Sequence, residues 1–202
     1  MIGNRIVVAA TLITILITLA ITRAAKTTLI ICALCVSHDI YSCWNSRLQT
    51  KLVLILTAIL CLVGNSALYI VYHREPDEVL VLITMSQISD ILQYIFGRTF
   101  GRHHVSKISP NKTLEGYLGG FLSLHLLTYL FSLYFISIPL INNLWDISLI
   151  YILGALGGVI FSAVKRYLNR KDFSNMLGTH GGWLDRTDSL YLPALYLLYK
   201  TI

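Results

Sequence analysis

Long apolar runs separated by short polar segments dominate this sequence. A helix needs about 20 apolar residues to cross the hydrocarbon layer of a membrane. Six runs approach that length and a shorter one closes the chain: Arg5–Thr22, Thr27–Trp44, Leu52–Tyr72, Val79–Phe96, Tyr117–Leu140, Trp145–Val164 and Leu190–Ile202. Because helices satisfy their own backbone polar groups in lipid, the sequence predicts an all-α, multi-pass transmembrane helical bundle.

The composition agrees with a membrane protein. Of the 202 residues 55% are hydrophobic and 13% are charged, whereas a soluble domain is typically about 25% charged. This leaves room for one bundle and no separate soluble domain. The first apolar run could be read as a signal peptide, but Arg23 interrupts the small-residue pattern of a cleavage site. We therefore expect that run to be kept as the first membrane helix.

The cysteines carry no metal signature. Cys32, Cys35, Cys43 and Cys61 all lie in the apolar first third of the chain. No second cysteine or histidine pair completes a zinc site. We expect them to behave as small apolar residues in helices.

Basic residues gather in two segments that predict the topology. Gly97–Glu115 holds four Lys and Arg residues and Lys165–Asp188 holds five, nine of the 16 in the chain. Two predicted spans separate the segments, so both must emerge on the same face, together with Asn45–Lys51. The opposite loops, His73–Glu78 and Ile141–Asp146, are poor in positive charge. Cytoplasmic loops carry the Lys and Arg excess, which places both basic segments in the cytoplasm.

The first basic segment suits a polyphosphate. Glycines at 97, 101, 116, 119 and 120 allow close backbone approach, and Ser109, Lys112 and Thr113 add hydroxyls and an ammonium group. A basic loop beside a membrane could equally attract anionic lipid headgroups. Just upstream, Asp90 sits in an apolar run, where an acid normally faces a cavity or a partner; a capping or salt-bridged carboxylate is the alternative.

The second basic segment adds carboxylates. Asp185 and Asp188 are three residues apart and would share one face of a helical turn, and Asp172 lies in the same loop. Mg²⁺ usually binds through one or two carboxylates plus substrate phosphates. His180, Gly181 and Gly182 offer an imidazole and exposed backbone N–H groups. Phosphate-plus-metal binding therefore explains this segment better than a purely structural loop.

A family resemblance makes this reading specific. The stretch "SAVKRYLNRKDFSNMLGTHGGWLDRTD", Ser162–Asp188, resembles the signature of the CDP-diacylglycerol synthases, or phosphatidate cytidylyltransferases. The upstream "SPNKTLEGYLGG" and "DILQYIFGRTFGRH" resemble two further motifs of that family. The similarity covers roughly residues 86–190. Residues 79–202 would form the catalytic membrane domain, and residues 1–78 would form N-terminal membrane helices that match the family poorly.

The resemblance implies cytidylyl transfer from CTP to phosphatidic acid, in the membrane and with Mg²⁺, either alone or together with a second cation. It implies a homodimer and no nucleic-acid partner. The expected metal ligands are Asp185, Asp188, Asp172 and Asp90. The expected catalytic residues are Lys165, Arg166, Lys171, His180 and Arg186, with His180 as a positioning donor. The expected nucleotide-binding residues are Ser109, Lys112, Thr113, Glu115, Gly181 and Gly182.

Other functions remain open at this point. A CTP-dependent kinase of polyprenols or related lipids also combines membrane helices with nucleotide loops, and another lipid phosphate, such as an ether lipid, could replace phosphatidic acid. A non-catalytic subunit that binds anionic lipid is the alternative from another class, although three acids in the loop disfavour it. Outside these segments, His125 is expected to form a hydrogen bond between helices. His38 and Asp39 have no partner that the sequence identifies.

Overall fold

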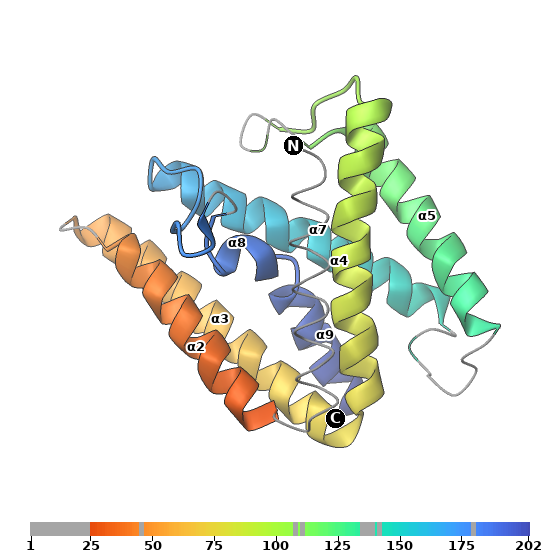
Figure 1. Ribbon diagram of the computed structural model, residues 1–202, viewed down its shortest axis with the longest axis horizontal. Helices are drawn as coiled ribbons and strands as arrows, with labels where there is room; N and C mark the ends of the chain where they lie inside the picture. Colours follow the sequence, from red (N-terminus) through yellow and green to blue (C-terminus); the bar gives the residue numbers. More distant parts are fainter. Residues whose placement is uncertain are drawn as a thin grey trace.

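The computed structural model describes residues 25–44, 47–106, 109, 112–133, 140, 143–178 and 181–202. These residues fold into seven helices (Figure 1): α2 (Ala25–Ser42), α3 (Leu48–Arg74), α4 (Pro76–Thr99), α5 (Leu114–Ser132), α7 (Leu144–Tyr167), α8 (Leu184–Thr187) and α9 (Tyr191–Thr201). The described part contains no β-strand, only an isolated antiparallel bridge between His104 and Thr113. The all-α prediction is confirmed. The predicted span Arg5–Thr22 lies outside the described residues.

Three helices are long and apolar enough to cross a membrane. They are α3, α4 and α7, with mean hydropathies of 2.2, 1.6 and 2.2 over their most apolar windows, and they contain the predicted spans Leu52–Tyr72, Val79–Phe96 and Trp145–Val164. Large apolar side chains on them, such as Leu52, Leu62 and Ile152, are exposed. A lipid environment accounts for such exposure, so we describe the chain as a membrane protein.

Short polar signals set where these helices begin. Pro76 is the first residue of α4, where its missing N–H costs nothing. The Thr113 hydroxyl accepts a hydrogen bond from the Gly116 N–H at 3.1 Å and caps α5, and Asn143 caps α7 by accepting from the Trp145 N–H at 3.0 Å. Each side chain satisfies a backbone donor that has no partner within its helix.

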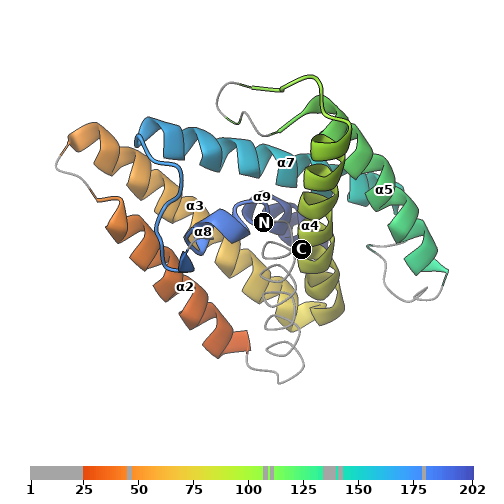
Figure 2. The ribbon, with the colours of Figure 1, turned by 45° about the horizontal axis from the view of Figure 1, so that its top comes forward.

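The helices pack as two pairs joined through α7 and α9. In both views α2 lies beside α3 and α4 beside α5 (Figures 1 and 2). Helix α9 packs on α3 and α7, and α8 lies between the α2–α3 pair and α7. Phe161 of α7 stacks on Tyr191 of α9, with 5.6 Å between ring centroids, inside a buried cluster that also includes Phe173 and Leu184. This core fixes the loop that precedes α8.

One end of the bundle is closed by polar contacts among helix termini. Asp146, in the first turn of α7, pairs with Lys200 of α9 and accepts a hydrogen bond from the Tyr196 hydroxyl at 2.6 Å. Arg74, the last residue of α3, donates to the Thr201 carbonyl at 2.8 Å. The end of α3, the start of α7 and the end of α9 therefore meet here.

Two smaller predictions are confirmed. His125 of α5 lies 2.9 Å from the Ser148 hydroxyl of α7 through Nε2, so it does bond between helices. All four cysteines are free; Cys35, Cys43 and Cys61 are buried and Cys32 is partly buried. They act as small packing residues.

Candidate functional site

The two polar segments predicted to cooperate come together beside the middle of α4. Ser189, just before α9, donates a hydrogen bond from its hydroxyl to Asp90 Oδ2 at 2.9 Å. Lys112, from the loop between α4 and α5, interacts electrostatically with Asp90 and with Asp188. Residues about 100 positions apart in the sequence, Asp90 and Ser189, thus share one polar site. The predicted convergence is present among the described residues.

Glycines of α7 make room for this convergence. A Cβ on Gly157 would lie 2.6 Å from the backbone oxygen of Asp188, and a Cβ on Gly158 would lie 2.7 Å from Lys112 Nζ. Because side-chain carbons do not approach that closely, the Asp188 backbone and the Lys112 ammonium can reach α7 only over bare backbone. Sequence reasoning missed these glycines, although small residues in a membrane helix often mark close packing.

Asp188 is a carboxylate in a place that disfavours its charge. Burial raises the pKa of Asp188 to about 6, against the opposing effect of the Lys165 ammonium. No described residue donates a hydrogen bond to its side chain. The pKa of Lys112 is lowered by burial, but Tyr117, Asp90 and Asp188 outweigh that effect and raise it. The site therefore combines a fixed cation with carboxylates that lack enough positive charge around them.

Asp185 has a different role from Asp188. Its Oδ1 accepts a hydrogen bond from Lys165 Nζ at 2.7 Å, with both side chains largely buried. Its Oδ2 accepts from the backbone N–H groups of Phe173 and Gly182, each at 2.9 Å. Gly181 lies close by with φ 82°, and a Cβ there would lie 2.9 Å from Asp185 Oδ2. Asp185 thus holds the loop of residues 173–182 against α7.

A second buried acid, Asp39 of α2, holds the same loop from the other side. Its side chain is fully buried. Oδ1 accepts from the Ser174 hydroxyl at 2.5 Å, and Oδ2 accepts from the backbone N–H of Leu184 at 2.8 Å. A Cβ on Gly182 would lie 2.4 Å from Asp39 Oδ2. The sequence alone identifies no partner for Asp39, although an acid in an apolar run is the same signal that marks Asp90.

The loop between α4 and α5 is held by Glu115. Its carboxylate accepts from the backbone N–H groups of Arg102 and His103 and contacts His103 Nδ1 at 2.5 Å. The hydrogen bond with His103 is the main cause that lowers the pKa of Glu115 to about 2. Gly101 packs against Thr113, whose Oγ1 would lie 2.8 Å from a Cβ there. Glu115 is therefore engaged with its own loop.

The remaining predicted residues lie in different surroundings. Arg186 interacts electrostatically with Asp90. Arg166 and Lys171 are exposed, and Asp172 lies beside Gly181, its Oδ1 3.2 Å from a Cβ built there. Ser109 accepts from the Lys112 backbone N–H at 3.1 Å. His180 lies outside the described residues.

The donor set fits Mg²⁺ only if substrate completes it. Among the described residues, no group of three or more His, Cys, Asp or Glu side chains is placed to enclose a metal ion. Asp90 and Asp188 form a pair of partly buried carboxylates that interact electrostatically with each other. One or two carboxylates with substrate phosphates are the usual Mg²⁺ ligands, so this pair suits a cation that arrives with a nucleotide.

Comparison with known proteins agrees with this chemistry. The model of the cytidylyltransferase family matches residues 2–202. A phosphatidate cytidylyltransferase of Aquifex aeolicus is 36% identical over 143 residues, 65% of this chain and 52% of the relative. That of Thermotoga maritima is 33% identical over 138 residues, 61% and 49% of the two chains. An uncharacterized Escherichia coli protein, YnbB, is 38% identical over 122 residues, 60% and 41% of the two chains. The chain spans about half the length of the curated relatives it matches.

Proposed function

This chain belongs to the cytidylyltransferase family, and from that premise we propose that it transfers the cytidylyl group of CTP to phosphatidic acid. The products would be CDP-diacylglycerol and pyrophosphate. Relatives named phosphatidate cytidylyltransferase support this substrate pair. The observation that carries the proposal is the meeting of Lys112 and Asp188 beside Asp90, which puts cationic and cation-binding groups from both signature segments in one place.

The reaction asks for positioning and charge neutralisation. A phosphate oxygen of phosphatidic acid attacks the α-phosphorus of CTP, and the bond from that phosphorus to the oxygen of the β-phosphate breaks as pyrophosphate leaves. Such transfers need little covalent chemistry from the protein. Lys112 and Lys165 would neutralise the phosphates. The lipid phosphate is already an oxyanion, so His180 would act as a positioning donor.

Asp188 and Asp90 would hold the Mg²⁺ ion. When bound, Mg²⁺ supplies charge stabilisation to the triphosphate and its leaving group. Asp185 would keep the loop in place through Lys165 and the backbone, and Asp172 would lie at its edge. Further phosphate contacts are assigned to Ser109, Thr113, Gly181, Arg166, Lys171 and Arg186. The Gly182 N–H, expected from the sequence to bind phosphate, is buried and already donates to Asp185.

The proposed location is a multi-pass membrane protein with its site on the cytoplasmic face. The end of α7, the start of α3 and the loop before α5 carry most of the basic residues, and such excess is typical of cytoplasmic loops. Membrane lipids would surround the helices, and a homodimer is the assembly that the family resemblance favours. No nucleic acid is involved in this proposal.

One assay separates the proposal from its alternatives. Purified protein in detergent with Mg²⁺, labelled CTP and phosphatidic acid should yield CDP-diacylglycerol and pyrophosphate. CDP and a phosphorylated alcohol, formed when a polyprenol is supplied, would instead identify a lipid kinase. Absence of turnover with any lipid acceptor, beside retained binding of anionic lipid, would identify a non-catalytic subunit.

A further inference from the structure

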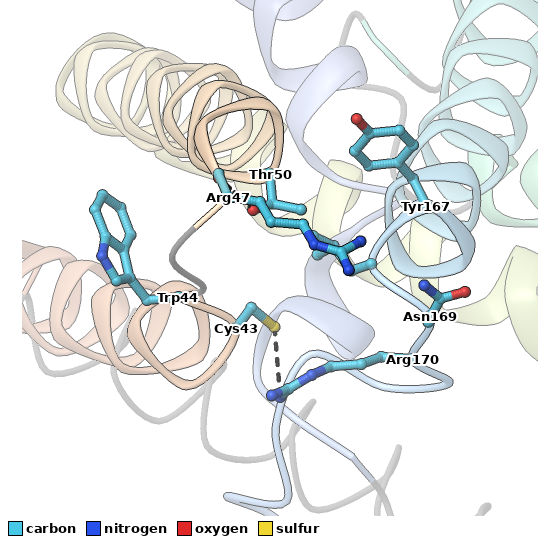
Figure 3. A pocket seen from close by; sticks show the side chains of 8 residues that line it. Cys43, Trp44, Arg47, Thr50, Tyr167, Asn169 and Arg170 are labelled. Carbon is cyan, nitrogen blue, oxygen red and sulfur yellow. Dashed lines mark hydrogen bonds between the residues drawn. The ribbon is translucent and has the colours of Figure 1, made fainter.

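A pocket outside the proposed catalytic site opens where the end of α2, the start of α3 and the end of α7 meet (Figure 3). Its lining includes Trp44, Arg47, Thr50, Tyr167, Asn169 and Arg170. Among the described residues, no acidic side chain lines it. The pocket therefore brings together two positively charged arginines with no lining carboxylate to offset their repulsion. Such a pocket suits an anion.

Both arginines are available for an anion. Figure 3 shows Arg47 and Arg170 extending into the pocket from different elements, the first from the start of α3 and the second from the loop after α7. No hydrogen bond or ion pair is formed by the Arg47 side chain with any described residue. Arg170 Nη1 contacts Cys43 Sγ at 3.8 Å, and sulfur is a weak acceptor.

Cys43 does not supply the missing negative charge. Its thiol donates to the Phe173 carbonyl at 3.0 Å, which requires the protonated form. Burial raises the pKa of the Cys43 thiol, so a thiolate is disfavoured. None of the described residues that line the pocket therefore carries a negative charge to pair with the two guanidinium groups.

The end of α7 fixes Arg170 in place. The Asn169 N–H donates to the Arg166 carbonyl at 3.0 Å, and the Arg170 N–H donates to the Lys165 carbonyl at 2.9 Å. This pair of bonds is a Schellman ending, which needs a left-handed residue. Asn169 has φ 54° and is the one non-glycine residue with positive φ in the described part. A hydrogen-bonded turn thus presents Arg170 and the Asn169 amide to the pocket.

The position of the pocket relative to the membrane indicates which anion it would bind. It lies at the ends of α3 and α7, two helices of membrane-spanning length. Trp44 and Tyr167 border it, each 49% exposed, and these residue types concentrate at the level of lipid headgroups. Guanidinium groups pair with phosphate through two parallel hydrogen bonds. We propose that Arg47 and Arg170 bind the phosphate of an anionic phospholipid headgroup.

This inference stands apart from the proposed reaction, because neither arginine belongs to the site around Asp90 and Asp188. Its test should use a lipid that is not the proposed substrate. Dioctanoyl phosphatidylglycerol carries a phosphodiester, without the phosphate monoester that would attack CTP. The full chain in neutral detergent is titrated with this lipid, and bound lipid is counted by native mass spectrometry. Dioctanoyl phosphatidylcholine and inorganic phosphate are the parallel probes.

The expected result is one phosphatidylglycerol bound more tightly than phosphatidylcholine. Arg47→Gln and Arg170→Gln should each weaken that binding about tenfold, since a hydrogen bond to a charged group contributes that much or more. Arg74→Gln is the matched control, because Arg74 ends the same helix that Arg47 precedes and lies far from the pocket. It should bind the lipid as the unaltered protein does.

Three outcomes would overturn the proposal. Equal lipid binding by all variants would show that the pocket is not used, and equal weakening in Arg74→Gln would reduce the effect to net charge. Inorganic phosphate that binds as tightly as the lipid, with the same dependence on both arginines, would make free phosphate the ligand. If Arg170→Gln fails to fold, Arg47→Gln alone decides the test. The Arg47 side chain forms no hydrogen bond or ion pair with a described residue, so its loss should leave the fold intact.

Discussion

The Asp39 carboxylate on α2 accepts a hydrogen bond from the backbone N–H of Leu184, the first residue of α8, at 2.8 Å. The same carboxylate accepts from the Ser174 hydroxyl. One buried side chain therefore joins the N-terminal helices to both ends of the loop that carries the signature glycines. That loop also meets α7 through Asp185, so it is held between two acids on opposite sides.

Removing the Asp39 anchor should loosen the loop and destabilise the protein. Hydrogen bonds to charged groups contribute about 1.5–3 kcal/mol each, so Asp39→Ala should lower the free energy of unfolding by about 3 kcal/mol and depress turnover. Asp39→Asn, which keeps one acceptor oxygen, should fall between. The measurements are thermal unfolding in detergent and the cytidylyl-transfer assay. Asp77→Ala is the control, because Asp77 is an exposed aspartate in the first turn of α4; equal behaviour of Asp77→Ala and Asp39→Ala would contradict the anchor.

Breaking the Lys165–Asp185 pair should cost both stability and activity. Removal of one partner leaves a buried charge unpaired, which typically costs about 3–5 kcal/mol. Lys165→Met should lower the unfolding midpoint strongly, whereas Lys171→Met, at an exposed lysine, should not. In the double variant Lys165→Met with Asp185→Asn, part of the stability should return while turnover stays low, because a phosphate-neutralising ammonium is still missing. Recovery of turnover in the double variant would limit Lys165 to a structural role.

A methyl group on α7 should disturb the site in a graded way. The Cβ of Gly157→Ala would collide with the backbone of Asp188, whereas that of Gly158→Ala would meet the flexible end of Lys112. Misplacing a catalytic group by about 1 Å can cost about a hundredfold in rate, so Gly157→Ala should lose much more activity than Gly158→Ala. Alanine favours a helix over glycine by about 1 kcal/mol, so a lower unfolding midpoint in Gly157→Ala would report the collision itself. Equal activities would argue against close packing here.

The hydrogen bonds that Glu115 accepts from its loop should persist at mildly acidic pH. They should weaken when substitution removes the charge of the side chain. The pKa of Glu115 is lowered from 4.5 to about 2. Its contribution to the folded loop is therefore present above pH 4.5 and is lost only as the pH falls through about 2. Glu115→Gln removes the charge at every pH and should speed tryptic cleavage at Arg98 and Arg102 at pH 7.5. Glu75→Gln, at an exposed residue between α3 and α4, should leave that cleavage rate unchanged.

The cation site should reveal itself by a loss of activity without a loss of stability. A partly buried carboxylate with too few hydrogen bonds is costly to keep ionised, so Asp188→Asn should keep or raise the unfolding midpoint. It should nevertheless abolish Mg²⁺-dependent turnover. Chelation by EDTA should stop the unaltered protein, and added Mg²⁺ should restore it. Full activity of Asp188→Asn across a Mg²⁺ titration would remove the ligand assignment.

Local pattern was enough to predict three helices of membrane-spanning length, α3, α4 and α7. The runs that form them are mainly apolar with few charged residues, and polar or proline residues end them. Charge spacing also predicted that Lys112 and Asp188 would share a site, because both must emerge on one face. These inferences need only the sequence near each residue and the thickness of a membrane.

Contacts between distant residues were beyond such reasoning. Asp185 and Asp188 share a helical spacing, yet Asp185 is hydrogen-bonded to Lys165 and the loop backbone. Asp188 accepts no hydrogen bond from a described side chain and interacts electrostatically with Lys165, Asp90 and Lys112. Asp39 meets partners 135 and 145 positions away, a pairing that packing decides. The glycines of α7 can be read from the sequence. The groups that pack against them, the Asp188 backbone and the Lys112 ammonium, are known only from the fold.

The position of Asp39 early in the chain imposes an order on biogenesis. Helix α2 is synthesised before Ser174 and Leu184, the two residues that donate hydrogen bonds to its Asp39 carboxylate. The donors that satisfy it arrive only after α7 has been made. A chain halted before that point lacks the donors that this carboxylate meets in the folded protein, and an acid without them is costly to bury. Helix α2 and the loop can therefore join only after α7 has been made.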